Sequence, residues 1–132
     1  NDYYKFLSST DIPANLDVIR RPSDINSIYT TSSLVLNLSK PSEWVETFGM
    51  TVIEGFAHGC PAIGPTVGGI TEIIEEGING FKISVNDIDK IADKIDMLAS
   101  NCAMHNALVS NAFITADKFK FAEYKKNILE VL

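Results

Sequence analysis

The sequence has 132 residues, enough for one domain with its own core, and it is 45% hydrophobic, 21% charged and 9% aromatic, as in ordinary soluble domains. Eleven Lys and Arg against 17 Asp and Glu give a net charge of −6, which argues against a nucleic-acid partner. Two cysteines are too few for a disulfide framework and no apolar run approaches the ~18 residues of a membrane span, so we expect a reduced, cytoplasmic protein.

The first third of the chain alternates short apolar runs with polar segments. In chain order, we expect strands at Tyr3–Leu7 and Leu16–Ile19, a helix at Ser23–Ser32, a strand at Ser33–Ser39 and a loop at Lys40–Phe48. Ser23 is the expected N-cap of the helix, with Asp24 in its first turn. The loop is longer than most strand-to-helix connections, and long loops tend to carry function.

Helical and strand patterns alternate through the rest of the chain. We expect a helix at Gly49–Gly59, a strand at Pro61–Ile63, a glycine-rich turn at Gly64–Gly69, a helix at Ile70–Glu76, a turn at Gly77–Gly80, a strand at Phe81–Ser84, and helices at Asp87–Ala99, His105–Asp117 and Phe119–Leu132. In the helix Asp87–Ala99, one face carries Ile88, Ile91, Ile95 and Leu98. The alternation predicts an α/β fold with a mostly parallel sheet, which binds ligands at the carboxyl ends of its strands.

Two acids flank the start of the helix at Gly49–Gly59. Glu46 precedes it on the loop and Glu54 lies just over one turn inside, with the backbone N–H groups of Gly49, Met50 and Thr51 between them. Unsatisfied donors and the positive dipole end attract a phosphate, while carboxylates accept hydrogen bonds from hydroxyls. The arrangement suggests a phosphate flanked by two hydroxyl-bearing groups, as in a nucleotide-sugar. The alternative is that Glu46 only caps the helix and Glu54 is only solvated.

Two other segments are weaker candidates for ligand binding. Gly68 and Gly69 precede another helix start, which is either a second oxygen-binding terminus or a tight turn that requires glycine. Arg20 and Arg21 follow a predicted strand, where they either contact a phosphate or base or form surface ion pairs. The sequence shows no cluster with the spacing of metal ligands.

Several motifs in the expected order make the stretch from Glu46 to Ile83 recognisable. It resembles the carboxy-terminal domain of group 1 (family 4) glycosyltransferases of GT-B architecture. The matching positions are Glu46, Phe48-Gly49, Glu54, Ala57-Gly59-Pro61, Gly68-Gly69-Glu72 and Gly77-Asn79-Gly80. The resemblance implies a Rossmann-like, three-layer domain that forms half of a GT-B fold and ends in helices. It also implies that the chain, residues 1–132, is a fragment that lacks its first strand and the amino-terminal acceptor domain.

The resemblance also implies roles for individual residues. Glu46, the expected catalytic-site residue, contacts hydroxyls of the donor sugar, and the amides of Phe48, Gly49, Met50 and Thr51 meet the sugar and diphosphate. Glu54 accepts hydrogen bonds from the ribose hydroxyls. The segment that contains Arg21 lies near the base. The glycines expected to serve structural turns are Gly68, Gly69, Gly77 and Gly80.

The implied activity is transfer of a sugar, with retention, from a nucleotide-diphosphate sugar to a glycan or lipid-linked acceptor bound by the missing domain. Neither a metal nor another cofactor is expected, and we expect the fragment alone to be inactive. The motifs look bacterial and typical of surface-polysaccharide assembly, and the full-length protein could contact a membrane peripherally. Two alternatives stay open: a nucleotide-sugar epimerase of the same architecture, and a binding module without chemistry.

Overall fold

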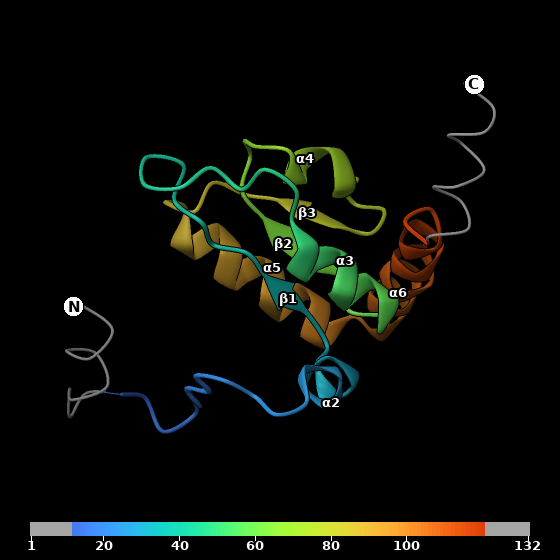
Figure 1. Cartoon of the computed structure of the whole chain (residues 1–132), viewed down its shortest axis with the longest axis horizontal. Coiled ribbons are helices and arrows are strands. Elements are labelled where there is room, and N and C mark those ends of the chain that lie inside the picture. Colours follow the sequence, from blue (N-terminus) through green and yellow to red (C-terminus); the bar gives the residue numbers. More distant parts are fainter. Residues whose placement is uncertain (1–11, 121–132) are drawn as a thin grey trace.

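The computed structural model describes residues 12–120, which fold around a three-stranded parallel sheet (Figure 1). In chain order the elements are α2 (Ile25–Thr31), β1 (Val35–Leu36), α3 (Met50–Ala57), β2 (Ala62–Gly64), α4 (Ile70–Ile73), β3 (Gly80–Lys82), α5 (Ile88–Ser100) and α6 (Cys102–Asp117). The strands lie in the order β1-β2-β3, with Val35 paired to Ala62 and Ala62 to Gly80. Helices α3 and α4 make the two crossovers, as parallel pairing requires.

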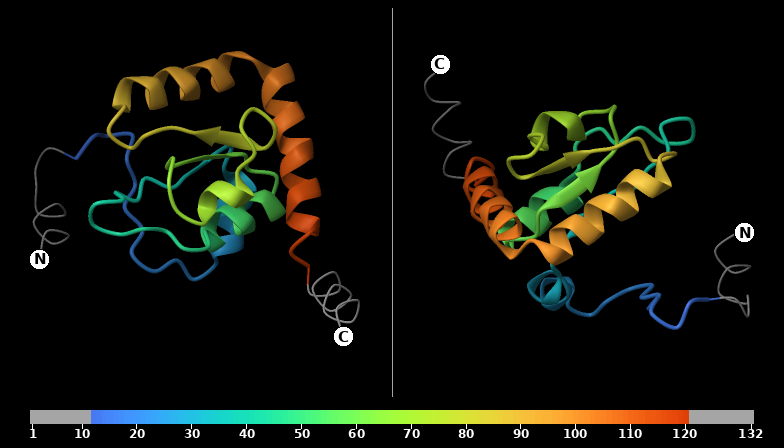
Figure 2. Two further views of the ribbon diagram at one scale, coloured as in Figure 1. Left: turned by 90° about the horizontal axis from the view of Figure 1, so that it is seen from above. Right: turned by 180° about the vertical axis from the view of Figure 1, so that it is seen from behind.

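Hydrophobic clusters cover both faces of the sheet. One cluster joins α3, α4 and α6 to the sheet through Val52, Phe56, Ala62, Ile70, Ile73, Ile74, Ala112 and Ala116. The other joins α5 and α6 to the opposite face through Ile63, Phe81, Leu98 and Leu108. Ala62 and Ile63 belong to different clusters because successive strand residues point to opposite faces. Figure 2 shows α5 across one face and α3 on the other, which confirms the predicted α/β class with layers on both sides.

The predicted strand at Leu16–Ile19 is wrong. The structure has no regular element there, and the side chains of Leu16, Val18 and Ile19 are exposed. A strand needs a neighbour for its backbone hydrogen bonds, and in the part of the chain that the structure describes β1 pairs only with β2. The predicted strand at Tyr3–Leu7 and almost all of the predicted helix at Phe119–Leu132 lie outside the described residues.

Two predicted helices have different ends in the structure. Helix α2 is capped by Asp24 and not by Ser23, because the Asp24 carboxylate accepts a hydrogen bond from the Asn26 N–H at 3.0 Å. Helix α4 stops at Ile73 and not at Glu76, since the next residue is extended and the Glu75 N–H donates to the side chain of Asn79 at 2.8 Å. A local hydrogen bond thus replaces the next helical one.

The apolar face predicted for α5 holds only in part. Ile91 and Leu98 are buried and Ile95 packs against the core, but Ile88 is 73% exposed. Ile88 is the first residue of the helix, before the turn that meets the sheet. Ile88 therefore lies on the apolar side of the helix, as its spacing predicts, but it is too close to the start of the helix to be covered by the core.

Candidate functional site

The loop between β1 and α3 lies against the glycine turn that follows β2, at the carboxyl edge of the sheet (Figure 1). The Gly69 N–H donates to the carbonyl oxygen of Glu46 at 3.0 Å. A Cβ on Gly69 would clash with the Thr47 carbonyl oxygen, and a Cβ on Gly68, which has a φ of 99°, would lie 2.5 Å from the Glu46 oxygen. These two glycines let the loop approach closely and so fix the backbone of Glu46.

The carboxylate of Glu46 is held by three hydrogen bonds. Its Oε1 accepts from the Gly49 N–H at 3.1 Å and the Phe48 N–H at 3.3 Å, and its Oε2 accepts from the Asn37 side chain at 3.4 Å. The backbone hydrogen bond from Gly49, followed by the one from Phe48, lowers the pKa of Glu46 below its usual value. Glu46 is therefore an ionised cap at the start of α3, partly exposed, with lone pairs left for a ligand.

This capping changes which amides are available to a phosphate. The family resemblance implies that the N–H groups of Phe48, Gly49, Met50 and Thr51 all meet the donor, but those of Phe48 and Gly49 already donate to Glu46. Gly49 is the N-cap of α3 with a φ of 76°, and Met50 and Thr51 are the first helical residues. The Met50 and Thr51 N–H groups have no acceptor within the helix, so they are the donors that remain for an anion.

Glu54 is exposed on α3, and its carboxylate is held by a residue from another helix. The Tyr29 hydroxyl of α2 donates to Glu54 Oε2 at 3.0 Å. The Tyr29 ring is buried and stacks on His58, with ring centroids 5.4 Å apart. Sequence reasoning missed Tyr29. A usable signal was its place beside Ile25 and Ile28 on one face of a short helix, which marks an inward-facing aromatic residue.

The two acids lie on either side of the first turn of α3. Glu46 caps the first turn, and Glu54 follows Met50 by four residues and Thr51 by three, on the exposed face. Residues at these spacings are neighbours on a helix surface, and helical side chains tilt toward the helix start. A ligand at the first turn of α3 would therefore lie within reach of both carboxylates.

Other predicted residues have different surroundings. Arg21 is exposed in the irregular segment before α2, which runs outside the body of sheet and helices (Figure 1), so its contact with a base stays a prediction. Phe48 is half exposed, and its ring meets Phe119 edge-on at 6.2 Å. Gly77 has a φ of 71° in the turn that precedes β3, and a Cβ on Gly80 would clash with the Ala62 carbonyl oxygen. Gly77 and Gly80 thus belong to the fold at the opposite edge of the sheet.

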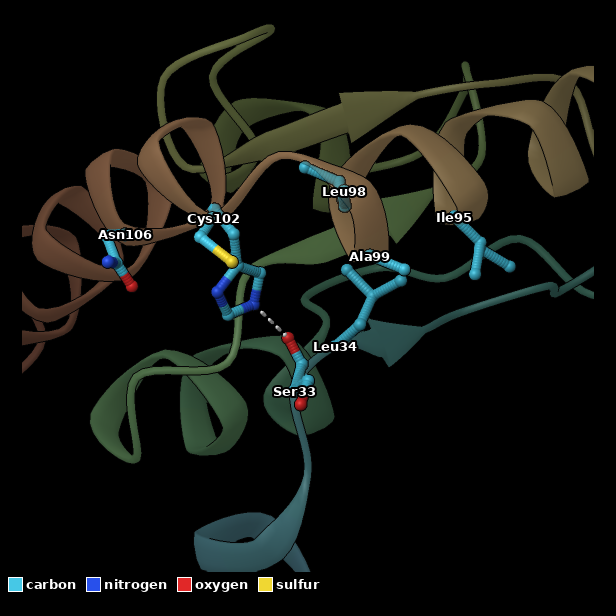
Figure 3. A pocket seen from close by; sticks show the side chains of 8 residues that line it. Ser33, Leu34, Ile95, Leu98, Ala99, Cys102 and Asn106 are labelled. Atoms are coloured by element: carbon cyan, nitrogen blue, oxygen red, sulfur yellow. Dashed lines mark hydrogen bonds between the residues drawn. The ribbon is translucent and has the colours of Figure 1, made fainter.

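The cavities near the sheet are lined by other residues. Lys40, Thr66 and Ser84 contribute to a hollow of about 170 Å³ at the carboxyl ends of the strands, and a hollow of about 520 Å³ lies beside it, between β3 and α5. A third, of about 400 Å³, lies between α5, the start of α6 and Leu34 (Figure 3). There His105 Nε2 lies 2.7 Å from the Ser33 carbonyl oxygen.

Residues 12–120 have neither a cluster of potential metal ligands nor a helix that could span a membrane. Nowhere in this range do three or more His, Cys, Asp or Glu side chains form a group that could hold a metal ion. No helix within the same range has the length and apolar character needed to cross a membrane.

Comparison with protein families gives one match that covers most of the chain. The family model described as "Glycosyl transferases group 1" matches residues 2–114. Among curated proteins, the N-acetyl-alpha-D-glucosaminyl L-malate synthase of Bacillus anthracis is 32% identical over 92 residues, which are 70% of this chain and 23% of that protein. The chain therefore spans about a quarter of the length of this relative.

Solved structures share the fold. Anabaena Alr3699/HepE in complex with UDP aligns with a TM-score of 0.74 and 25% identity, covering 83% of this chain and 30% of that one. The same protein in complex with UDP-glucose aligns with a TM-score of 0.69. The carboxy-terminal domain of LpcC, a group 1 family glycosyl transferase from Francisella tularensis, aligns with a TM-score of 0.64 and 28% identity over 76% of this chain and 51% of that one.

Proposed function

The chain belongs to the group 1 glycosyl transferase family, and from this premise we propose that it binds the nucleotide-diphosphate sugar for a retaining glycosyl transfer. The observation that carries the proposal is the first turn of α3, where two free amides lie between an ionised cap, Glu46, and a held carboxylate, Glu54. The Anabaena structures with UDP and UDP-glucose support it, because their fold aligns with this one.

Each part of the donor has a matching group at this turn. The diphosphate accepts from the Met50 and Thr51 N–H groups, where the positive end of the helix dipole adds attraction. The free lone pairs of Glu46 accept from hydroxyls of the transferred sugar, and those of Glu54 accept from the ribose hydroxyls. In this proposal, Arg21 contacts the base of the nucleotide.

The transfer itself breaks the bond between the sugar anomeric carbon and the diphosphate oxygen and forms a bond from that carbon to an acceptor oxygen. We propose that the leaving diphosphate takes the acceptor proton and that the α3 dipole and amides stabilise its charge, without a metal or other cofactor. The acceptor is bound outside this chain, so that the chain alone does not turn over.

The acceptor and the cellular setting belong to the same proposal. The sequence pattern supports a glycan or lipid-linked acceptor in bacterial surface-polysaccharide assembly, in the cytoplasm and with peripheral membrane contact. The free thiols of Cys60 and Cys102 fit a reducing compartment. A radiolabel transfer assay of the full-length protein, with a lipid-linked glycan and with a small hydroxy acid, tests the acceptor. Transfer to the hydroxy acid alone would contradict the proposed glycan or lipid-linked acceptor.

Calorimetry separates the roles of the two acids. We expect Glu54→Ala to weaken binding of a nucleoside diphosphate and of its sugar conjugate alike, by about 10–150-fold, the loss for a charged hydrogen bond. Glu46→Ala should weaken binding of the sugar conjugate and leave binding of the nucleoside diphosphate unchanged. The ratio of the affinity for the conjugate to the affinity for the diphosphate should therefore fall.

For Glu46→Ala the ratio of affinities also guards against damage to the fold, because a partly unfolded variant loses affinity for both ligands equally. For Glu54→Ala an unchanged thermal midpoint is the guard, because that variant is itself expected to weaken both ligands alike. Glu43→Ala is the matched control, since Glu43 is exposed on the same loop and pairs with Lys40 at 3.7 Å on the surface. If no nucleoside diphosphate among UDP, GDP and ADP binds, or if neither acid affects binding, the proposed function is wrong.

A further inference from the structure

We propose that Tyr29 is a positioning residue that holds Glu54 so that its free lone pairs face the ribose hydroxyls of the donor. This inference rests on the proposed function, because it assigns the partner that makes Glu54 a ribose-binding group. It adds to the donor site a helix, α2, that none of the sequence motifs includes.

The contact itself joins an exposed carboxylate to a buried phenol. Tyr29 Oη lies 3.0 Å from Glu54 Oε2, across 25 residues of sequence, and Tyr29 is only 8% exposed. An unrestrained glutamate on a helix surface samples many rotamers, and binding a ligand through it has an entropic cost. A fixed donor at one oxygen selects one orientation of the carboxylate before the ligand arrives.

Tyr29 is held from two sides. Its ring stacks on His58, whose Nδ1 lies 2.8 Å from the Glu54 carbonyl oxygen, at the end of α3. The Cys60 thiol donates to the Tyr29 carbonyl oxygen at 3.1 Å and so ties the end of α2 to the start of β2. The phenol is therefore fixed to the helix that carries Glu54.

The chemistry leaves room for the ligand. An ionised carboxylate has about four lone-pair sites, and the phenol occupies one of them on Oε2. The whole of Oε1 stays free, together with the second site on Oε2, for two neighbouring hydroxyls. Burial, followed by the hydrogen bond to Glu54, raises the pKa of Tyr29 to about 12, so the phenol keeps its proton at neutral pH and remains a donor.

The test measures discrimination between a nucleotide and its deoxy analogue. UDP, GDP and ADP are titrated by calorimetry, and the tightest is compared with its 2′-deoxy and 3′-deoxy forms on the wild-type protein. We expect removal of one hydroxyl to weaken binding about 10–150-fold. Tyr29→Phe keeps the buried ring and removes only the donor, and it should reduce this discrimination about 3–10-fold.

Two further variants make the result decisive. Glu54→Gln should reduce the same discrimination, as the proposed function requires. Asp24→Ala removes the N-cap of α2 without changing any contact that holds Tyr29, and it should lower the thermal midpoint while leaving the discrimination unchanged.

If Glu54→Gln reduces the discrimination and Tyr29→Phe does not, the role of Tyr29 is overturned and the proposed function stands. If Glu54→Gln has no effect, the ribose contact in the proposed function fails, and the inference about Tyr29 fails with it.

Discussion

Glu46 can both cap α3 and bind a ligand, although the sequence pattern alone presents these two roles as alternatives. It caps α3 through the Gly49 and Phe48 amides, and it still has lone pairs for a ligand. The capping explains why an acid can stand beside an anion site: its charge is already compensated by two N–H groups. Met50 and Thr51 are left to meet the diphosphate, so acid and phosphate use separate donors.

The capping bond predicts a pH dependence of stability. The hydrogen bonds lower the pKa of Glu46 from its ordinary value of 4.5, so their contribution is fully present above about pH 4.5 and is lost as the pH falls through the lower, folded-state pKa. Glu46→Gln should be less stable than wild type at pH 7, and the difference should shrink as the pH falls below 4.5. Thermal midpoints from pH 7 to pH 3 measure this. Glu43→Gln is the control, and a constant difference for Glu46→Gln would contradict the account.

At the scale of elements, a buried asparagine joins α4, β3 and α6. Asn79 has no exposed surface, and its Nδ2 donates to the Ile73 carbonyl oxygen and to Thr115 Oγ1, both at 3.0 Å. Its Oδ1 accepts from Glu75. The residue ends α4 and fixes α6 against it, which explains one motif position by packing and not by ligand binding.

Asn79→Ala should destabilise the fold by about 3 kcal/mol, because it leaves buried polar groups without partners. Asn111→Ala is the matched control, since Asn111 is partly exposed on α6 and its side chain donates one hydrogen bond, to the Ile78 carbonyl oxygen at 3.1 Å. We expect it to cost about 0.5–1 kcal/mol. Urea denaturation of both variants measures the difference, and equal losses would show that the buried network adds nothing.

The glycine turns give a second prediction at this scale. Gly69→Ala should push the Glu46 loop away from the turn, since a Cβ would clash with the Thr47 carbonyl oxygen, and should weaken donor binding as well as stability. Gly77 also needs glycine, for its φ of 71°, but a Cβ there would meet nothing within 4 Å. Gly77→Ala should therefore cost about 1–2 kcal/mol and leave donor affinity unchanged. Calorimetry and thermal unfolding on both variants test this, and unchanged donor affinity in Gly69→Ala would contradict it.

For the whole molecule, the alternation of strands and helices could be predicted from the sequence. The spacing of apolar residues that is typical of a helix or of a buried strand can be recognised within a short stretch of sequence. The strand at Leu16–Ile19 failed because a strand also depends on a neighbour, which a local pattern does not contain. Glu46 and Glu54 could be selected from their positions around a helix start. Tyr29 could be recognised at most as an inward-facing aromatic residue. Its contact with Glu54 could not be predicted, since it spans 25 residues and depends on how α2 packs.

The central claim is that the first turn of α3 binds a nucleotide-diphosphate sugar, and a crystal structure of the protein with such a donor tests it most directly. We predict the diphosphate on the Met50 and Thr51 amides, the sugar hydroxyls on Glu46 and the ribose hydroxyls on Glu54, within about 3.5 Å. A donor bound in the hollow between β3 and α5, with neither acid in contact with it, would contradict the claim.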